Sequence, residues 1–322
     1  MKIIRRDISI PILATFLISI DCFVAQSMTS SFRPGSRLAR KLLEKYEADQ
    51  VHRNTDHASW YHVNLKKIPE ELCSSFIQSH QDEETSNFLE HCFDKSEWIF
   101  TQFYHSLMKS ILGWFMTQTS INGFLERGSM FVFSTSQFDN LLGLDPLWKS
   151  YKLLDLGAGD GKVTERIAHH FNETFATEAS KPMTWRLKEK GYKILEIDEW
   201  ADGKHTYDVI TCLNLLDRIA QPITLLQEMH RVLAPDTGRL VVAVVLPFKP
   251  YVEFGSEDNR QIETVSISGR TFEEQITSLI NDIFLPAGFQ LLKFTRLPYL
   301  CEGDMEQSFY VLHDAVFVLK RS

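Results

Sequence analysis

Three alternating glycines, Gly157, Gly159 and Gly161, follow an apolar stretch at residues 153–156 and precede a pattern that suits a helix. This order is typical of a buried parallel strand that passes through a turn into a crossover helix. Glycines let the backbone come close to a bound molecule, and the free N–H groups at the helix start lie in the crevice at the strand's carboxyl end. The spacing therefore predicts a ligand-binding turn.

Two acidic residues, Asp155 and Asp160, indicate which ligand this turn prefers. A dinucleotide-binding turn reads G-x-G-x-x-G and faces a pyrophosphate, whereas here the third glycine comes one residue earlier. Because carboxylates repel phosphate and attract an amino group or a sulfonium, we expect a ligand with such groups. The turn resembles the first motif of class I S-adenosylmethionine-dependent methyltransferases, in which it faces the amino-acid end of the cofactor. A tight turn without a ligand is the alternative.

A further acid, Glu178, lies about twenty residues beyond the glycine turn, at the end of a predicted strand. A carboxylate at this place can accept hydrogen bonds from both ribose hydroxyls of a nucleoside cofactor. Without the turn, a solvated glutamate would be the preferred interpretation. With the turn, we favour ribose binding by Glu178.

Asn214 and Asp217 follow the predicted fourth strand and stand three residues apart. Ligands of doubly wound sheets bind beyond the carboxyl ends of the strands, so a methyl acceptor is expected to meet the sulfonium here. Side chains at this spacing on one turn can point into one pocket. Capping of the following turn is the alternative for both residues.

A closer resemblance involves seven segments: residues 119–123, 127–133, 153–161, 212–218, 246–248, 250–253 and 295–305. Together they resemble the DREV family of methyltransferases, from about residue 98 to the C-terminus, and the last segment is highly specific. The resemblance implies a protein-histidine methyltransferase that modifies Nδ1, the pros nitrogen, in His-x-His motifs with a small x. The chain itself contains no His-x-His motif, so the sequence gives no indication of automethylation.

The same resemblance implies roles for individual residues. The implied cofactor contacts are Gly157, Gly159, Glu178, Asn214 and Tyr299. The implied acceptor pocket is formed by Asp217 and Tyr310, with Asn214 shared between pocket and cofactor. Asp155, Asp160 and Gly161 complete the predicted cofactor site, and no metal is expected in it.

The chemistry of the acceptor can be argued independently. Methyl transfer is an in-line displacement at a sulfonium carbon, and a protonated imidazole has no lone pair for it. Methylation of Nδ1 needs the neutral tautomer with its proton on Nε2, and a carboxylate that accepts this N–H fixes tautomer and orientation. We assign this role to Asp217, with Asn214 holding cofactor or ring and Tyr310 bounding the pocket. Asp217 should also stabilise the imidazolium as it forms.

Two other functions remain compatible with these residues. A small-molecule methyltransferase would have an enclosed acceptor pocket, whereas an enzyme acting on peptides needs an open groove. A non-catalytic binding module would keep the fold with a blocked cofactor site, which the intact glycine turn and Glu178 disfavour.

The elements that position these residues alternate along the chain, which predicts an α/β fold with a doubly wound, seven-stranded, Rossmann-like sheet. The predicted strands cover residues 153–156, 175–178, 192–197, 207–212 and 240–246, with a closing antiparallel pair at 289–295 and 315–320. The predicted helices cover residues 98–116, 161–171, 181–191, 222–233 and 271–287. Trp200, after the third strand, could stack on adenine or simply pack in the core.

We divide the chain into residues 1–27, a signal peptide or signal anchor; 28–60, a flexible linker; 61–150, a helical extension with a cofactor-covering loop; and 151–322, the methyltransferase core. The basic start and the short apolar run after it are typical of a secretory signal, and no stable membrane span is expected beyond a possible N-terminal anchor. This predicts the endoplasmic reticulum and secretory pathway, with the mitochondrion as second choice. Asn172 then lies in a glycosylation sequon.

Composition limits the partners. A net charge of −8 and a pI near 5.8 give no overall attraction to nucleic acid and suit cationic peptides better. The five cysteines form no C-x-x-C pair, so neither a zinc site nor a dense disulfide framework is indicated. Cys73 and Cys92 could pair in an oxidising compartment, and Cys212 is expected to pack in a buried strand.

Overall fold

The structure is a computed structural model that describes residues 37–97, 121, 125, 128–145, 148–252, 258–304 and 306–322. The predicted signal segment, the predicted helix at 98–116 and part of the cofactor-covering loop lie outside these residues. The chain forms two compact units, Met1–Thr55 and Asp56–Ser322. In the first unit the structure describes one helix, α2 (Arg37–Arg53), within the stretch interpreted as a linker.

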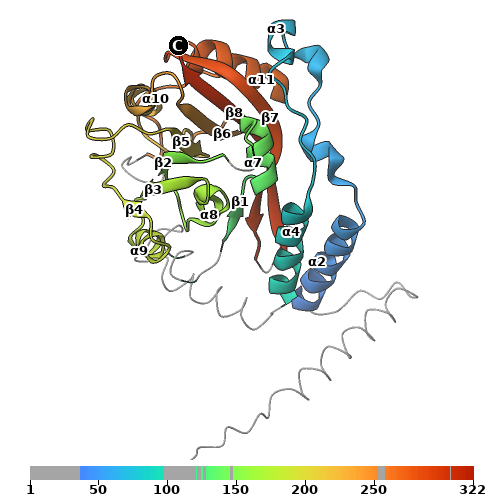
Figure 1. The fold of residues 1–322 in the computed structure, drawn as a ribbon. Helices are drawn as coiled ribbons and strands as arrows, with labels where there is room; N and C mark the ends of the chain where they lie inside the picture. Colours follow the sequence, from blue (N-terminus) through green and yellow to red (C-terminus); the bar gives the residue numbers. More distant parts are fainter. Residues whose placement is uncertain are drawn as a thin grey trace, which may run out of the picture. The chain divides into compact units, whose positions relative to one another are not determined.

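The second unit is built on a mixed sheet whose described strands have the order β1-β7-β8-β6-β5-β2-β3-β4 (Figure 1). The parallel strands are β2 (Ser150–Leu156), β3 (Phe171–Thr177), β4 (Lys193–Ile194), β5 (Val209–Leu213) and β6 (Arg239–Val245). Next to β6, β8 (Phe309–Arg321) and β7 (Phe289–Glu302) continue the sheet as an antiparallel pair. The chain winds outward from β2 in both directions, which confirms the doubly wound α/β class.

Each of the seven predicted strands has a counterpart, and the sheet has an eighth described strand that the sequence did not predict. The additional strand is β1 (Met130–Phe131), which pairs antiparallel with the end of β7 through Met130 opposite Cys301. Its partner lies near the other end of the chain, so no local pattern reveals a strand of two residues. Two further predictions differ in extent: the third strand keeps only Lys193–Ile194, and the last helix continues into a π-helix.

The helices of the second unit begin at recognisable residues. Two helices open with capping boxes: α7 (Thr135–Leu142) at Ser134 and α11 (Phe272–Ser278) at Thr271. The crossover helices are α8 (Lys162–Ala168), α9 (Lys181–Glu189) and α10 (Pro222–Val232), the last two with proline in the first turn. The other helices whose bounds the structure describes are η1 (His57–Tyr61), η2 (Leu65–Lys67), α3 (Glu70–Cys73), α4 (Glu83–Glu97) and the π-helix η3 (Leu279–Phe284).

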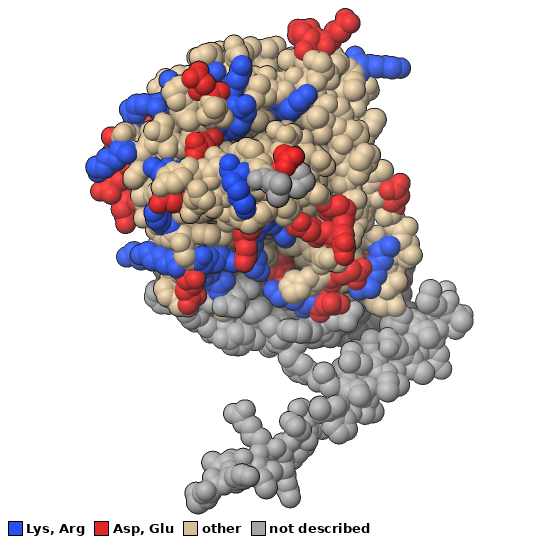
Figure 2. Space-filling view, viewed as in Figure 1, with Lys and Arg blue, Asp and Glu red and all other residues tan. Residues whose placement is uncertain are grey.

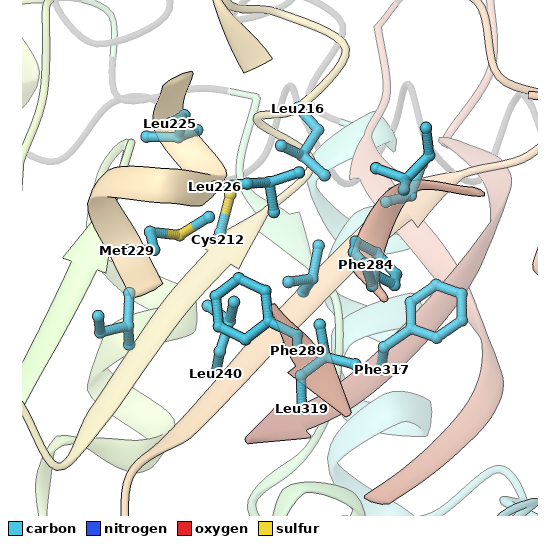
Figure 3. Close-up of a cluster of buried hydrophobic side chains, with 14 of the residues drawn as sticks. Cys212, Leu216, Leu225, Leu226, Met229, Leu240, Phe284, Phe289, Phe317 and Leu319 are labelled. Carbon is cyan, nitrogen blue, oxygen red and sulfur yellow. The ribbon is translucent and has the colours of Figure 1, made fainter. Parts of the chain in front are cut away.

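Each face of the sheet has its own hydrophobic core, because side chains alternate along the strands. On one face α10, α11 and η3 pack on the sheet, with Leu226, Phe284 and Phe317 at the centre (Figure 3). The other face carries Leu153 and Val209 together with residues of α4, α7 and α8. Helices α4 and α7 of the predicted extension are therefore part of the core of the second unit.

Several other predictions can be compared with the fold. Cys73 and Cys92 are both free, so the structure has no bridge between them, whereas Cys212 is fully buried in β5 as expected. Asn172 lies in β3 with an exposed side chain, where the sequence suggested a helix end. Within the described ranges, no helix combines the length and the apolar character needed to cross a membrane. Entry into the secretory pathway stays a prediction.

Candidate active site

The glycine turn lies between β2 and α8, where the sequence predicted it. Gly157, Gly159 and Gly161 have φ angles of 69°, 57° and 73°, a left-handed region that disfavours other residues. A Cβ atom at Gly161 would lie 2.6 Å from Leu187 Cδ2, and one at Gly157 would lie 3.0 Å from Leu215 Cδ1. Gly159 has no such neighbour within 4 Å, so it is the glycine of the turn that leaves open space for a ligand.

Asp155 lies beneath the turn. Its Oδ2 accepts a hydrogen bond from the Thr164 hydroxyl at 2.5 Å, and its Oδ1 accepts one from the Thr211 hydroxyl at 2.7 Å. Burial raises the pKa of Asp155 to about 6. Asp155 therefore ties β2 to β5 and α8, which holds the turn in place. Asp160 is half-buried and accepts the backbone N–H of Lys162 at 3.1 Å, which stabilises the start of α8.

Glu178 follows β3 directly and faces the turn. Its Oε2 accepts the backbone N–H of Gly159 at 3.0 Å, and its Oε1 accepts that of Ser180 at 2.8 Å. Because β2 and β3 are parallel neighbours, their carboxyl ends meet and bring this carboxylate beside the glycines. The arrangement fits the position at which a ribose is bound in sheets of this type.

Asn214 and Asp217 lie at the same edge, after β5. Asn214 has φ 53°, and its backbone N–H donates to the Ala243 carbonyl at 2.9 Å. Its side-chain Nδ2 donates to Oδ2 of Asp314 at 2.8 Å. Asp217 is buried, and its Oδ2 lies 3.0 Å from the Arg218 Nε. The structure therefore brings Asn214 and Asp217 into one buried cluster with Asp314.

Asp314 is a site residue that the sequence analysis missed. It lies on β8, opposite Val245 of β6 and Leu297 of β7, and it is fully buried. A signal was present in the sequence, because this acid stands directly before the apolar run 315–319 of a central strand. The fact that it faces Asn214 follows only from the pairing of β8 with β6.

One side-chain oxygen of each cluster member, Asn214, Asp217 and Asp314, is buried without a hydrogen-bond partner among the described residues. Each such atom costs about 1–3 kcal/mol unless a ligand or water satisfies it. Burial raises the pKa of Asp217, although the Arg218 guanidinium opposes the rise. Burial likewise raises the pKa of Asp314 to about 8, and the charge of Asp217 adds to it. The free oxygens of Asn214 and Asp217 therefore call for an N–H donor or a cation, whereas Asp314 keeps a proton.

The two predicted tyrosines occupy different places. Tyr299 of β7 is half-buried, its hydroxyl donates to Met130 Sδ, and burial raises its pKa well above the ordinary value. Tyr310 is 36% exposed, and its hydroxyl donates to Asp304 Oδ1 at 3.1 Å. Asp314 comes four positions after Tyr310 on an extended strand, a separation of roughly 13 Å. Tyr310 therefore stands at the rim of the site and not in the buried cluster.

Trp200 packs in the core and is only 4% exposed, near Phe175 and Tyr207. Of its two interpretations, the structure therefore supports packing.

In the parts of the chain that the structure describes, no group of three His, Cys, Asp or Glu side chains is arranged to hold a metal. Charges on the face shown in Figure 2 are uneven, with basic side chains at the lower left, where α9 lies, and acidic ones at the lower right.

The titration of Asp314 predicts a pH dependence of stability. The folded protein keeps a proton on Asp314 up to about pH 8, whereas the unfolded chain loses it near 3.8. The free energy of unfolding should therefore fall as pH rises between these values, by at most about 1.4 kcal/mol per pH unit from this group. Asp314→Asn lacks the titration, so we expect its urea-unfolding free energy to fall less steeply with pH than that of the wild type.

The variant keeps the ionisable side chains that interact electrostatically with Asp314, namely Asp217, Tyr299 and Cys301. The difference between the two curves is therefore specific to position 314. Parallel curves for wild type and variant would show that Asp314 is ionised in the folded protein over the whole range.

Comparisons with known proteins give one family model and several similar solved structures. The DREV methyltransferase family model matches residues 60–321. Among solved structures, a SAM-dependent methyltransferase from Leishmania major shares 16% identity over 58% of this chain and 71% of that chain, with a TM-score of 0.39. Magnesium protoporphyrin IX methyltransferase from Synechocystis, with bound SAH, shares 14% identity over 58% and 82%, also with a TM-score of 0.39.

A third similar structure is a complex of the Haloferax volcanii Trm112 methyltransferase activator. The identity to the matched chain of that complex is 16%, with a TM-score of 0.31. The match covers 40% of this chain and 61% of that chain. The identification rests on the family model, which spans most of the chain, and on residues that fit its cofactor: the open turn at Gly159 and the adjoining Glu178. The chain belongs to the DREV methyltransferase family, and S-adenosylmethionine is its cofactor.

Proposed function

We propose that this methyltransferase acts on protein histidine, at Nδ1 of His-x-His motifs in which x is small. The observation that carries the proposal is the buried acceptor cluster of Asn214, Asp217 and Asp314 beside the glycine turn. A neutral imidazole offers one N–H donor and one lone pair, so an acceptor that binds the N–H leaves the lone pair for the reaction. The resemblance of the sequence to the DREV family supports the same substrate.

Asp217 would accept the Nε2–H of the substrate ring. Its Oδ1 is buried and has no partner among the described side chains, while Arg218 at Oδ2 favours the charged form. The bond would fix the tautomer in which Nδ1 carries the lone pair. S-adenosylmethionine supplies the methyl group as an electrophilic carbon on a sulfonium. As positive charge develops on the ring, the Asp217 carboxylate would stabilise it.

The surroundings of the site support a peptide substrate over an enclosed small molecule. Met130, Tyr310 and Leu312 are large side chains exposed to 41%, 36% and 41%, on strands β1 and β8 next to β7. Exposed apolar side chains grouped near a site are typical of surfaces that bind another chain.

A matched pair of glycine variants tests the cofactor site. Gly159 and Gly143 both have left-handed φ angles and no atom within 4 Å of an added Cβ, but Gly143 ends α7 away from the turn. Alanine at either position should therefore destabilise the protein similarly, by about 1–2 kcal/mol. We expect only Gly159→Ala to weaken binding of S-adenosylhomocysteine, about tenfold or more in calorimetry, because the new methyl group fills ligand space. Equal affinities would remove Gly159 from the cofactor site.

A substitution at Asp217 separates catalysis from cofactor binding. Asp217→Asn keeps the volume of the side chain but replaces the carboxylate by a neutral amide. We expect turnover to fall about a hundredfold or more, while the calorimetric affinity for S-adenosylhomocysteine stays near that of the wild type. Turnover close to the wild-type rate would exclude Asp217 from the mechanism.

The substrate itself is tested with labelled S-adenosylmethionine and peptides containing Ala-His-Ala-His. We expect label in these peptides and none in His→Ala controls, and amino-acid analysis should give Nδ1-methylhistidine. Label found only on Nε2, or in the controls, would contradict the proposed acceptor atom. An absence of label from all peptides, together with normal cofactor binding, would favour a small-molecule substrate.

A further inference from the structure

We propose that Asp314 is a positioning residue of the active site: it holds the side-chain amide of Asn214 so that the amide oxygen is left to accept an N–H of the substrate. The inference rests on the proposed function, because that function assigns Asn214 to the acceptor pocket. It concerns a residue on β8, far along the chain from the turn that carries Asn214 and Asp217.

The position of Asp314 is unfavourable for a carboxyl group. It is fully buried, and the residues that follow it on β8, Ala315, Val316 and Phe317, are fully buried as well. No ion pair of Asp314 with Lys, Arg or His occurs among the described residues, and its only hydrogen-bonding side chain there is Asn214. A buried acid that caps no helix and neutralises no cation contributes little to stability, so its role lies with its partner.

The bond between Asp314 and Asn214 determines which way the amide faces. Oδ2 of Asp314 accepts a hydrogen bond from Nδ2 of Asn214 at 2.8 Å, so the proton that Asp314 keeps up to about pH 8 lies on its other oxygen, Oδ1. The amide oxygen must then face away from Asp314, and it has no hydrogen-bond partner among the described residues. The backbone of Asn214 is held independently, by its N–H bond to the Ala243 carbonyl. Both ends of the residue are therefore fixed.

This arrangement makes the pocket selective for a donor. If the amide turned over, its NH₂ group would face the ligand and repel an imidazole N–H, and the hydrogen bond from Nδ2 to Asp314 Oδ2 would be lost. Asparagine at position 314 can still accept from Asn214 through its own amide oxygen. Alanine cannot. Both variants lack the acid, so a difference between them reports the hydrogen bond to Asn214.

The experiment compares Asp314→Ala, Asp314→Asn and a control, Asp139→Ala. Asp139 bonds His170 Nε2 at 2.7 Å, and His170 precedes β3 and so lies at the opposite edge of the sheet. With Ala-His-Ala-His peptide, we expect kcat to fall about 10- to 100-fold in Asp314→Ala and to stay within about threefold in Asp314→Asn. The control should keep the wild-type kcat even though it too loses a hydrogen bond.

A second readout does not depend on activity. In wild type and Asp314→Asn, the side-chain NH₂ protons of Asn214, identified by comparison with Asn214→Ala, should exchange slowly with solvent in NMR spectra. In Asp314→Ala they should exchange fast. Wild-type kcat in Asp314→Ala, equal losses in Ala and Asn variants, or unchanged exchange would overturn the inference. If the wild type fails to methylate the peptide but the exchange pattern holds, the proposed substrate is wrong and the positioning by Asp314 stands.

Discussion

The parallel pairing of β2 with β3 and β5 is the constraint on which the site depends. Parallel neighbours end at the same edge, so three turns that are separate in sequence meet there. The glycine turn follows β2, Glu178 follows β3, and Asn214 follows β5. Cofactor and acceptor can therefore share one crevice without any long loop to carry the chemistry.

The buried acids at this edge differ in how completely their carboxyl oxygens are hydrogen-bonded. Asp155 has both oxygens bonded to threonine hydroxyls, so its burial is compensated and it stabilises the turn. Asp217 and Asp314 each keep an oxygen without a partner among the described residues, so their burial is not compensated within the protein. The difference distinguishes an acid that stabilises the turn from two acids whose hydrogen bonds within the described residues are incomplete, although all three look alike in the sequence.

The antiparallel pair β7 and β8 explains why a methyl acceptor can lie next to the cofactor. β8 runs against β6, so its residue Asp314 reaches the same edge at which the parallel strands end. β7 brings Tyr299 to that edge and pairs with β1, whose exposed Met130 touches the tyrosine. Helices α4 and α7 pack on the face of the sheet that Leu153 and Val209 line.

The sequence by itself determined the α/β class, the glycine turn and the acids beside it, because these depend on local periodicity and on residues close together in the chain. Only the tertiary structure decided that β1 joins the sheet, that Trp200 packs in the core, that Cys73 and Cys92 stay apart, and that Asp314 faces Asn214. Each of these depends on a partner far away in sequence. Strand pairing brings such partners together, and no local pattern records it.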